Sequence, residues 1–358
     1  MGDLLREKQV AEGARFVDYA GRQAAADFGA AGDEASAVRS AVGLIDLSWR
    51  SLLRFTGDDR AAFLHSMTTN HVLDLPAGAL QPTTCCDATG HLVGVLTLIN
   101  TGDAYWAEMH PGCAEDVMTI LDKHLVMEDV EIAEIHGAWG ILSLQGPSAQ
   151  SALQSVVGPG LTLPGPFQIR EWSANGEPAY LLWISHTGEH GFGILAPRET
   201  LPGLWTQLLG AVREHGGRPV GLDALNALRI EAGIPWWGED LDHSLLALEA
   251  GMEDWVHYAK GCYLGQETLA RIHFRGRTNR QLMGLSLSNI AGLPSRGVRL
   301  HSEDREAGWV TSAVQSPTLG RPIALGFVRR EFLTPGTPLT LEDGDEAVVT
   351  ELPFVRGH

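Results

Sequence analysis

The chain has 358 residues, which is more than one hydrophobic core usually supports, so we expect two or three domains. Its apolar fraction of 44% and charged fraction of 20% are those of an ordinary globular protein and exclude a disordered chain. The formal net charge of −18 argues against nucleic acid as the main partner. No apolar run approaches the roughly 20 residues that span a bilayer, so we expect no membrane partner. Four scattered cysteines form neither a disulfide framework nor a zinc-site spacing, which favours the cytoplasm and no metal site.

Residues 1–37 are rich in alanine, glycine and charge and are interpreted as a lead-in segment. A first α+β domain is expected over residues 38–135. It begins with strands near 44–47 and 52–55 and continues with a strand pair in "HLVGVLTLIN" and "AYWAEMH". A helix should start at Pro111, because proline is favoured in the first turn of a helix.

The same order of strand, turn, strand, proline and helix returns in "AYLLWIS", "GFGILAP" and the segment after Pro197. This repetition predicts a second, related α+β domain over residues 136–280, with a crevice between the two halves. After residue 280 the chain changes to short strands separated by Gly, Pro and Asp. This spacing predicts a small antiparallel β-barrel over residues 281–358.

Two features near residue 230 are candidates for binding. Arg229 and Glu231 lie two residues apart on a predicted helix and therefore do not share a face. Arg229 suits carboxylate recognition through its planar guanidinium, although a surface ion pair explains the spacing equally well. Trp236 and Trp237 offer a flat face for a heteroaromatic ring, or ordinary packing at a domain interface.

The segment "KGCYLGQETLARIHFRGRTNRQ" concentrates a thiol and several guanidiniums in an acidic chain. An ammonium at Lys260 beside Cys262 favours the reactive thiolate, so these two residues are candidates for catalysis. The alternative is that Cys262 is a small core residue without chemistry.

Residues 260–267, "KGCYLGQE", match the K-G-C-[FY]-x-G-Q-E signature of the YgfZ-type folate-binding proteins, a branch of the glycine-cleavage T-protein (aminomethyltransferase) superfamily. The chain resembles this superfamily from about residue 42 to residue 353. "GLDALNALRIEAGIPWWGEDLD", "GWVTSAVQSPTLGRPIALGFV" and "CDATGHLVG" are similar to its other motifs and occur in the same order.

The resemblance implies a three-domain ring of two related α+β domains and a C-terminal β-barrel around a funnel that binds tetrahydrofolate. It implies that Cys262 is the working thiol and that Lys260 activates it. The cofactor contacts would come from five residues: Arg229, Trp236, Tyr263, Gln266 and Glu267. The arginine-rich span would attract the tail of a polyglutamylated folate.

The chain departs from the aminomethyltransferases where these carry acids. Gly94 and Val95 stand in place of an Asp-Asp pair, and Gly193 stands in place of a second glutamate. We therefore expect a tetrahydrofolate-binding protein without glycine-cleavage activity, which supports assembly or repair of iron–sulfur clusters and has client or assembly proteins as partners. The alternatives are a folate-dependent methyl- or aminomethyl-transferase that uses other acids, and a non-catalytic folate-binding scaffold.

Overall fold

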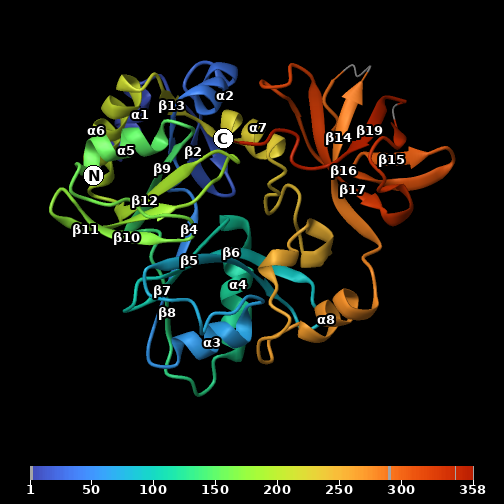
Figure 1. The fold of residues 1–358 in the computed structure, drawn as a ribbon, viewed down its shortest axis with the longest axis horizontal. Helices are drawn as coiled ribbons and strands as arrows, with labels where there is room; N and C mark the ends of the chain where they lie inside the picture. Colours follow the sequence, from blue (N-terminus) through green and yellow to red (C-terminus); the bar gives the residue numbers. More distant parts are fainter. Residues whose placement is uncertain (1–2, 289–291, 343, 358) are drawn as a thin grey trace.

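The computed structural model describes residues 3–288, 292–342 and 344–357. It has three lobes, each built on its own sheet (Figure 1). A six-stranded sheet forms one lobe, a five-stranded sheet forms the second, and a closed six-stranded barrel forms the third. Within the described ranges, no helix is both long and apolar enough to cross a membrane.

The six-stranded sheet has the order β10-β11-β12-β9-β3-β13 and is antiparallel except for the pairing of β3 with β13. Its strands are β3 (Gly43–Asp46), β9 (Trp139–Gln145), β10 (Ile169–Ala174), β11 (Glu177–Trp183), β12 (Gly191–Pro197) and β13 (Arg218–Val220). The helices of this lobe are α1 (Leu4–Ala11), α2 (Ala31–Ser40), α5 (Ala149–Val157) and α6 (Leu201–Glu214). Helix α6 buries Leu204, Trp205 and Leu208 against the sheet. These residues form an apolar stripe on one face of the helix, and such a face packs on the core.

The five-stranded sheet is antiparallel and has the order β5-β6-β7-β4-β8. Its strands are β4 (Ser51–Thr56), β5 (Ala79–Cys86), β6 (Leu92–Asn100), β7 (Tyr105–Met109) and β8 (Glu131–Glu134). Helix α3 (Arg60–Met67) follows β4, and helix α4 (Pro111–His124) follows β7 with proline in its first turn. The chain thus crosses from one sheet to the other between β3 and β4, within a few residues.

The two sheets repeat one arrangement. The order β4-α3-β5-β6-β7-α4 in one lobe corresponds to β9-α5-β10-β11-β12-α6 in the other, and the first four strands of each sheet lie in the same spatial order. The expected pairing of two related α+β units is therefore confirmed. The prolines do not correspond as expected, because Pro111 begins α4 whereas Pro197 ends β12 and Pro202 stands in the first turn of α6.

The expected C-terminal barrel is also confirmed, with the closed order β14-β17-β16-β15-β18-β19. Its strands are β14 (Arg280–Ser288), β15 (Arg299–Ser302), β16 (Arg305–Gln315), β17 (Pro322–Arg329), β18 (Pro338–Leu341) and β19 (Glu346–Thr350), and one turn of 3₁₀ helix, η3 (Arg330–Phe332), follows β17. Alternate strand residues such as Leu285, Val310 and Ala324 fill its interior.

The segments outside the sheets run through the centre of the molecule. Helix α7 (Leu222–Glu231) lies between the six-stranded lobe and the barrel, and the chain then passes through η1 (Ala247–Ala250) and η2 (Glu253–Trp255) to α8 (Gln266–Arg275) beside the five-stranded lobe (Figure 1). The lead-in forms a hairpin of β1 (Arg15–Tyr19) and β2 (Arg22–Asp27), which packs on α7.

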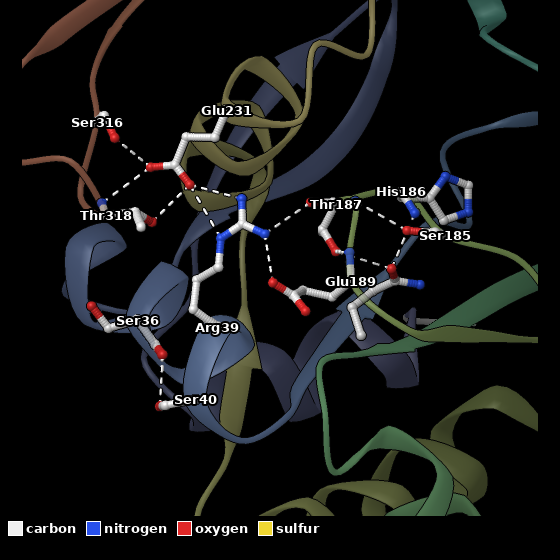
Figure 2. A network of polar contacts seen from close by, with 12 residues as sticks. Ser36, Arg39, Ser40, Ser185, His186, Thr187, Glu189, Glu231, Ser316 and Thr318 are labelled. Carbon is white, nitrogen blue, oxygen red and sulfur yellow. Dashed lines mark hydrogen bonds and ion pairs between the residues drawn. The ribbon is translucent and has the colours of Figure 1, made fainter. Parts of the chain in front are cut away.

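A buried ion-pair network joins α2, the β11–β12 turn, α7 and the barrel (Figure 2). Arg39 donates to Glu189 at 2.7 Å and to Glu231 at 2.8 Å. Glu231 also accepts hydrogen bonds from the hydroxyls of Ser316 at 2.5 Å and Thr318 at 2.8 Å. This network holds α7, and therefore the centre of the molecule, in a fixed position against the barrel.

Candidate functional site

A crevice of about 290 Å³ opens where the β1–β2 hairpin, α7 and the barrel meet. It is lined by Tyr19, Leu222, Asp223, Asn226, Arg229, Trp236, Glu239, Pro294, Arg296, Thr311, Ser312 and Ala313. Concave sites that combine aromatic faces with a few polar groups are the usual places for small ligands in proteins. Two of the residues predicted from the sequence, Arg229 and Trp236, lie here.

Arg229 is only 1% exposed and is held by its neighbours on every side. It forms an ion pair with Asp240, and it donates to Asn226 at 2.9 Å, to the Ile234 carbonyl at 3.3 Å and to Ser312 at 2.7 Å. A guanidinium has five N–H donors, so these contacts leave one donor on Nη2 among the residues described. Arg229 therefore connects α7 to the barrel as well as lining the crevice.

Trp236 belongs to an aromatic cluster with Tyr19 and Trp49, next to the turn of the β1–β2 hairpin. Tyr19 meets Trp49 edge to face with ring centroids 5.1 Å apart, and it meets Trp236 at 6.0 Å. The guanidinium of Arg229 lies over Trp236 at 5.0 Å from the ring centroid, a distance typical of a cation–π contact. These contacts fix the two rings that flank the crevice.

His110 connects Tyr19 to the start of α4. Its Nδ1 accepts the backbone N–H of Gly112 at 3.0 Å, and its Nε2 lies 3.1 Å from the Tyr19 hydroxyl oxygen. Burial, with the charges of Arg50, Arg22 and Arg229, lowers the pKa of His110 to about 3. The imidazole is therefore neutral across the physiological range.

This lowered pKa predicts an acid-sensitive fold. In the unfolded chain His110 binds a proton below its ordinary pKa of about 6.5, whereas in the folded chain it stays neutral down to about 3. Protons therefore favour the unfolded state in this window, and stability should fall as the pH is lowered from about 6.5. His110→Asn should reduce the slope of unfolding free energy by about 1.4 kcal/mol per pH unit between pH 4 and 6. Urea denaturation at several pH values measures this slope, and an unchanged slope would exclude His110 as its source.

A second buried ion pair stands behind the aromatic cluster. Arg50, which follows β3, contacts Glu108 on β7, and both side chains are nearly inaccessible. Burial lowers the pKa of Arg50 to about 10, and its guanidinium lies 5.5 Å from the ring centroid of Trp49. The pair carries no net charge, so it holds Trp49 in place without adding charge to the crevice.

Two carboxylates line the crevice itself. Asp223 is paired with Arg15 at 2.9 Å. Glu239 is half-buried. Burial of Tyr19 is the main cause that raises the pKa of its hydroxyl, and the nearby negative charge of Glu239 is the second. Glu239 is thus a carboxylate beside an aromatic hydroxyl in a partly dehydrated crevice, a setting suited to accepting a proton from a bound amine.

The remaining predicted site residues lie elsewhere. Lys260, Cys262, Tyr263, Gln266 and Glu267 are not among the residues that line the crevice. The ammonium of Lys260 donates to the carbonyls of His65 at 2.5 Å, Thr68 at 2.6 Å and Asn70 at 2.7 Å, at the end of α3. Lys260 therefore satisfies helix-terminal carbonyls, a role that the spacing in the motif did not indicate.

Cys262 is the exposed cysteine, whereas burial raises the pKa of the Cys113 thiol to about 11 and that of Cys86 to about 12. Tyr263 is buried under the Lys260 ammonium, which lies 4.8 Å from the centroid of its ring.

Gln266 and Glu267 are the first two residues of α8, which follows Gly265 with its positive φ of 83°. Within the part of the chain that the structure describes, no group of three His, Cys, Asp or Glu side chains is placed to hold a metal ion.

We expect Lys260→Met to lower the free energy of unfolding by about 2–4 kcal/mol, because it leaves several buried carbonyls without a donor. Methionine keeps most of the apolar part of the lysine side chain, so the loss of unfolding free energy measures the contribution of the ammonium group. Lys123→Met on the exposed side of α4 is the control and should change stability by less than about 0.5 kcal/mol. Chemical denaturation measures both, and equal stability of the two variants would contradict a structural role for Lys260.

Two of the positions where acids were expected, Gly94 and Gly193, face packed interior. A Cβ atom on Gly94 would lie 2.4 Å from Cγ2 of Val117 on α4, and one on Gly193 would lie 3.2 Å from Cγ2 of Ile184. A carboxylate at residue 94 would require at least the Val117 side chain to shift. If this chain uses a carboxylate, that carboxylate comes from another element.

Residues 5–260 match the GCVT N-terminal domain, and residues 280–356 match the glycine cleavage T-protein C-terminal barrel domain. The chain belongs to the glycine cleavage T-protein family. An aminomethyltransferase of Rubrobacter xylanophilus is 32% identical over 353 residues, covering 98% of this chain and 93% of that protein. One of Geobacillus sp. is 32% identical over 333 residues, covering 92% of this chain and 91% of that protein.

The crystal structure of glycine cleavage system aminomethyltransferase T from Bartonella henselae superposes with a TM-score of 0.88 at 24% identity, covering 99% of this chain and 97% of that one. This likeness concerns the fold and confirms the T-protein-like arrangement of two α+β lobes and a barrel.

The functional expectation is wrong. A YgfZ-type role in iron–sulfur cluster assembly without glycine-cleavage activity is contradicted by T-protein relatives that are named aminomethyltransferase and match over nearly the full chain. The expectation of iron–sulfur partners fails with it. The missing acids at Gly94, Val95 and Gly193 were taken to exclude the chemistry, whereas the carboxylates that line the crevice, Asp223 and Glu239, come from other segments.

Sequence reasoning missed Tyr19, Trp49, Glu108, His110 and Glu239. Tyr19 precedes an Ala-Gly pair between two strand-like stretches, which is a hairpin signal hidden in the lead-in. Glu108 is the one acid in the otherwise apolar strand "YWAEM", a pattern typical of a buried, paired charge. Glu239 stands in the acidic stretch "GEDLD", which is as typical of a solvated loop as of a site.

Proposed function

We propose that this protein is a tetrahydrofolate-dependent aminomethyltransferase whose ligand occupies the crevice between the hairpin, α7 and the barrel. The observation that carries the proposal is the convergence of Trp236, Arg229 and Glu239 in that crevice. The names of the T-protein relatives support the reaction class.

The donor set of the crevice fits part of a reduced folate. Trp236 and Tyr19 supply aromatic faces, Glu239 supplies a carboxylate for an amine, and Arg229 and Arg296 supply donors for anionic or carbonyl oxygens. The volume of about 290 Å³ is close to the lower end of the roughly 300–1,000 Å³ usual for ligand sites. The crevice therefore encloses one end of such a molecule, and the rest extends outward.

When bound, tetrahydrofolate supplies the amine nitrogens that take up the transferred one-carbon unit. In the proposed mechanism Glu239 accepts the proton that an amine loses as it forms its new bond to the aminomethyl carbon. That carbon gives up its bonds to its amino nitrogen, which leaves as ammonia, and to the lipoyl sulfur, which leaves as the thiol. Trp236 stacks on the ring. The pair of Arg229 and Asp240 keeps Trp236 in place, because the backbone N–H of Trp236 donates to Asp240 at 2.9 Å and the Arg229 guanidinium lies over the indole. Arg271, Arg275 and Arg277 at the end of α8 are exposed and are the proposed contacts of a polyglutamate tail.

The remaining assignments from the sequence also stay proposals. Cys262 is exposed on the loop before α8, and Tyr263, Gln266 and Glu267 surround the same turn, so a role in binding there would concern the outer part of the ligand.

The direct test supplies an aminomethylated lipoyl carrier protein and tetrahydrofolate under anaerobic conditions and measures methylene-tetrahydrofolate and ammonia. Turnover that requires both substrates supports the proposal. Tight binding of tetrahydrofolate without turnover would reduce the protein to a folate-binding scaffold, and no binding at all would overturn the proposal.

A further inference from the structure

The hydroxyl of Tyr19 has a direction that the surrounding contacts determine. Because Nδ1 of His110 accepts the N–H of Gly112, this nitrogen carries no proton. A neutral imidazole has a single N–H, so the proton is on Nε2. Nε2–H therefore donates to the Tyr19 oxygen at 3.1 Å, and the hydrogen of the Tyr19 hydroxyl must be directed to another acceptor.

The tyrosine ring has little freedom to turn away. Ala20 and Gly21, with φ of 49° and 76°, form the two-residue loop of a tight hairpin that places Tyr19 at its tip. Arg22, on the other side of the loop, donates to the carbonyls of Trp49 and Arg50 at 2.9 Å each. Together with the edge-to-face contacts to Trp49 and His110, these bonds anchor the tip against the first turn of α4 and the β3–β4 connection.

Tyr19 lines the crevice together with Glu239, so a ligand in the crevice can supply the acceptor for its hydroxyl hydrogen. A donor and a carboxylate acceptor next to one another match a ring that carries a carbonyl oxygen beside an amine N–H. We propose that Tyr19, oriented by His110, is the hydrogen-bond donor that recognises this carbonyl oxygen, and that Glu239 accepts from the neighbouring amine N–H, whose proton it takes in the proposed function. This inference rests on the proposed function, because the ring of tetrahydrofolate is the one to be recognised.

The role of Tyr19 is tested by isothermal titration with tetrahydrofolate. Tyr19→Phe removes only the hydroxyl and should weaken binding about two- to tenfold, the range of one neutral hydrogen bond. An analogue whose ring carbonyl is replaced by an amino group should bind wild type less well than tetrahydrofolate does, and Tyr19→Phe should lose this discrimination. Tyr180→Phe on β11 is the matched control and should bind like wild type.

The role of His110 as a positioning residue needs its own variant. His110→Asn keeps a side-chain acceptor for the N-terminus of α4, since asparagine is a favoured N-cap, and removes the Nε2–H donor. It should weaken binding as much as Tyr19→Phe does, and the double variant should be no weaker than either single variant. Nitrogen-15 spectra of wild type should show the Nε2–H tautomer of His110.

The outcomes separate the inference from the proposed function. If wild type does not bind tetrahydrofolate, the proposed function fails and the inference fails with it. If wild type binds and turns over while Tyr19→Phe binds equally well, or if His110 carries its proton on Nδ1, only the inference is overturned. Thermal melts of all variants show whether a loss of affinity arises from unfolding.

Discussion

Glu239→Gln should lower kcat for aminomethyl transfer by about 10²–10⁴-fold, the usual contribution of a positioned general base or acid. Glutamine keeps the size and the acceptor oxygen of the side chain but cannot take a proton. Binding of tetrahydrofolate should change much less than turnover, because the stacking face of Trp236 and the donor of Arg229 remain. Initial rates across a range of tetrahydrofolate concentrations give kcat and KM separately.

The second carboxylate of the crevice supplies the control. Asp223 is held by Arg15, so Asp223→Asn should leave kcat within about threefold of wild type, as expected for an exposed ion pair that contributes little. A larger loss of kcat in Asp223→Asn than in Glu239→Gln would move the role of base to Asp223. Equal and full activity in both variants would exclude a carboxylate of this crevice from the transfer.

Arg39→Met should destabilise the fold by about 3–5 kcal/mol or more, because removing one partner of a buried ion pair leaves the other charge uncompensated. Here two carboxylates, Glu189 and Glu231, would lose their shared guanidinium. Their oxygens are inaccessible to water, and Arg39 itself is 10% exposed. Methionine fills most of the volume of the aliphatic part of arginine. The loss of stability therefore measures the missing charge and hydrogen bonds rather than the cost of a cavity.

Urea denaturation of Arg39→Met and of the control Arg213→Met measures this effect. Arg213 forms an exposed ion pair with Glu12 and should contribute about 0–1 kcal/mol. Because Glu231 is bonded to Ser316 and Thr318, the loss of Arg39 should also loosen the barrel from α7, which hydrogen exchange in the loop between β16 and β17 will detect. A destabilisation no larger than that of Arg213→Met would mean that the network does not hold the lobes together.

The sequence by itself determined the classes of element and their order. The change to short strands after residue 280, the repeated strand–turn–strand–helix order and the helix start at Pro111 all have local causes in side-chain period, turn residues and proline geometry. The barrel and the two related sheets followed from them. From the motif "KGCYLGQE" the sequence placed Lys260 beside the neighbouring thiol, because only residues close in sequence were compared, whereas the lysine donates to carbonyls at the end of α3.

The tertiary structure alone decided which distant groups meet. Lys260 reaches carbonyls almost 200 residues away at the end of α3, Arg229 pairs with Asp240 and with Ser312 on the barrel, and Tyr19 comes from a segment interpreted as a lead-in. Strand β3 pairs with β9 and β13 rather than with its neighbour in sequence. Contacts of this kind depend on long-range packing and on burial that raises the energetic cost of an unpaired charge, and no local pattern of residues records them.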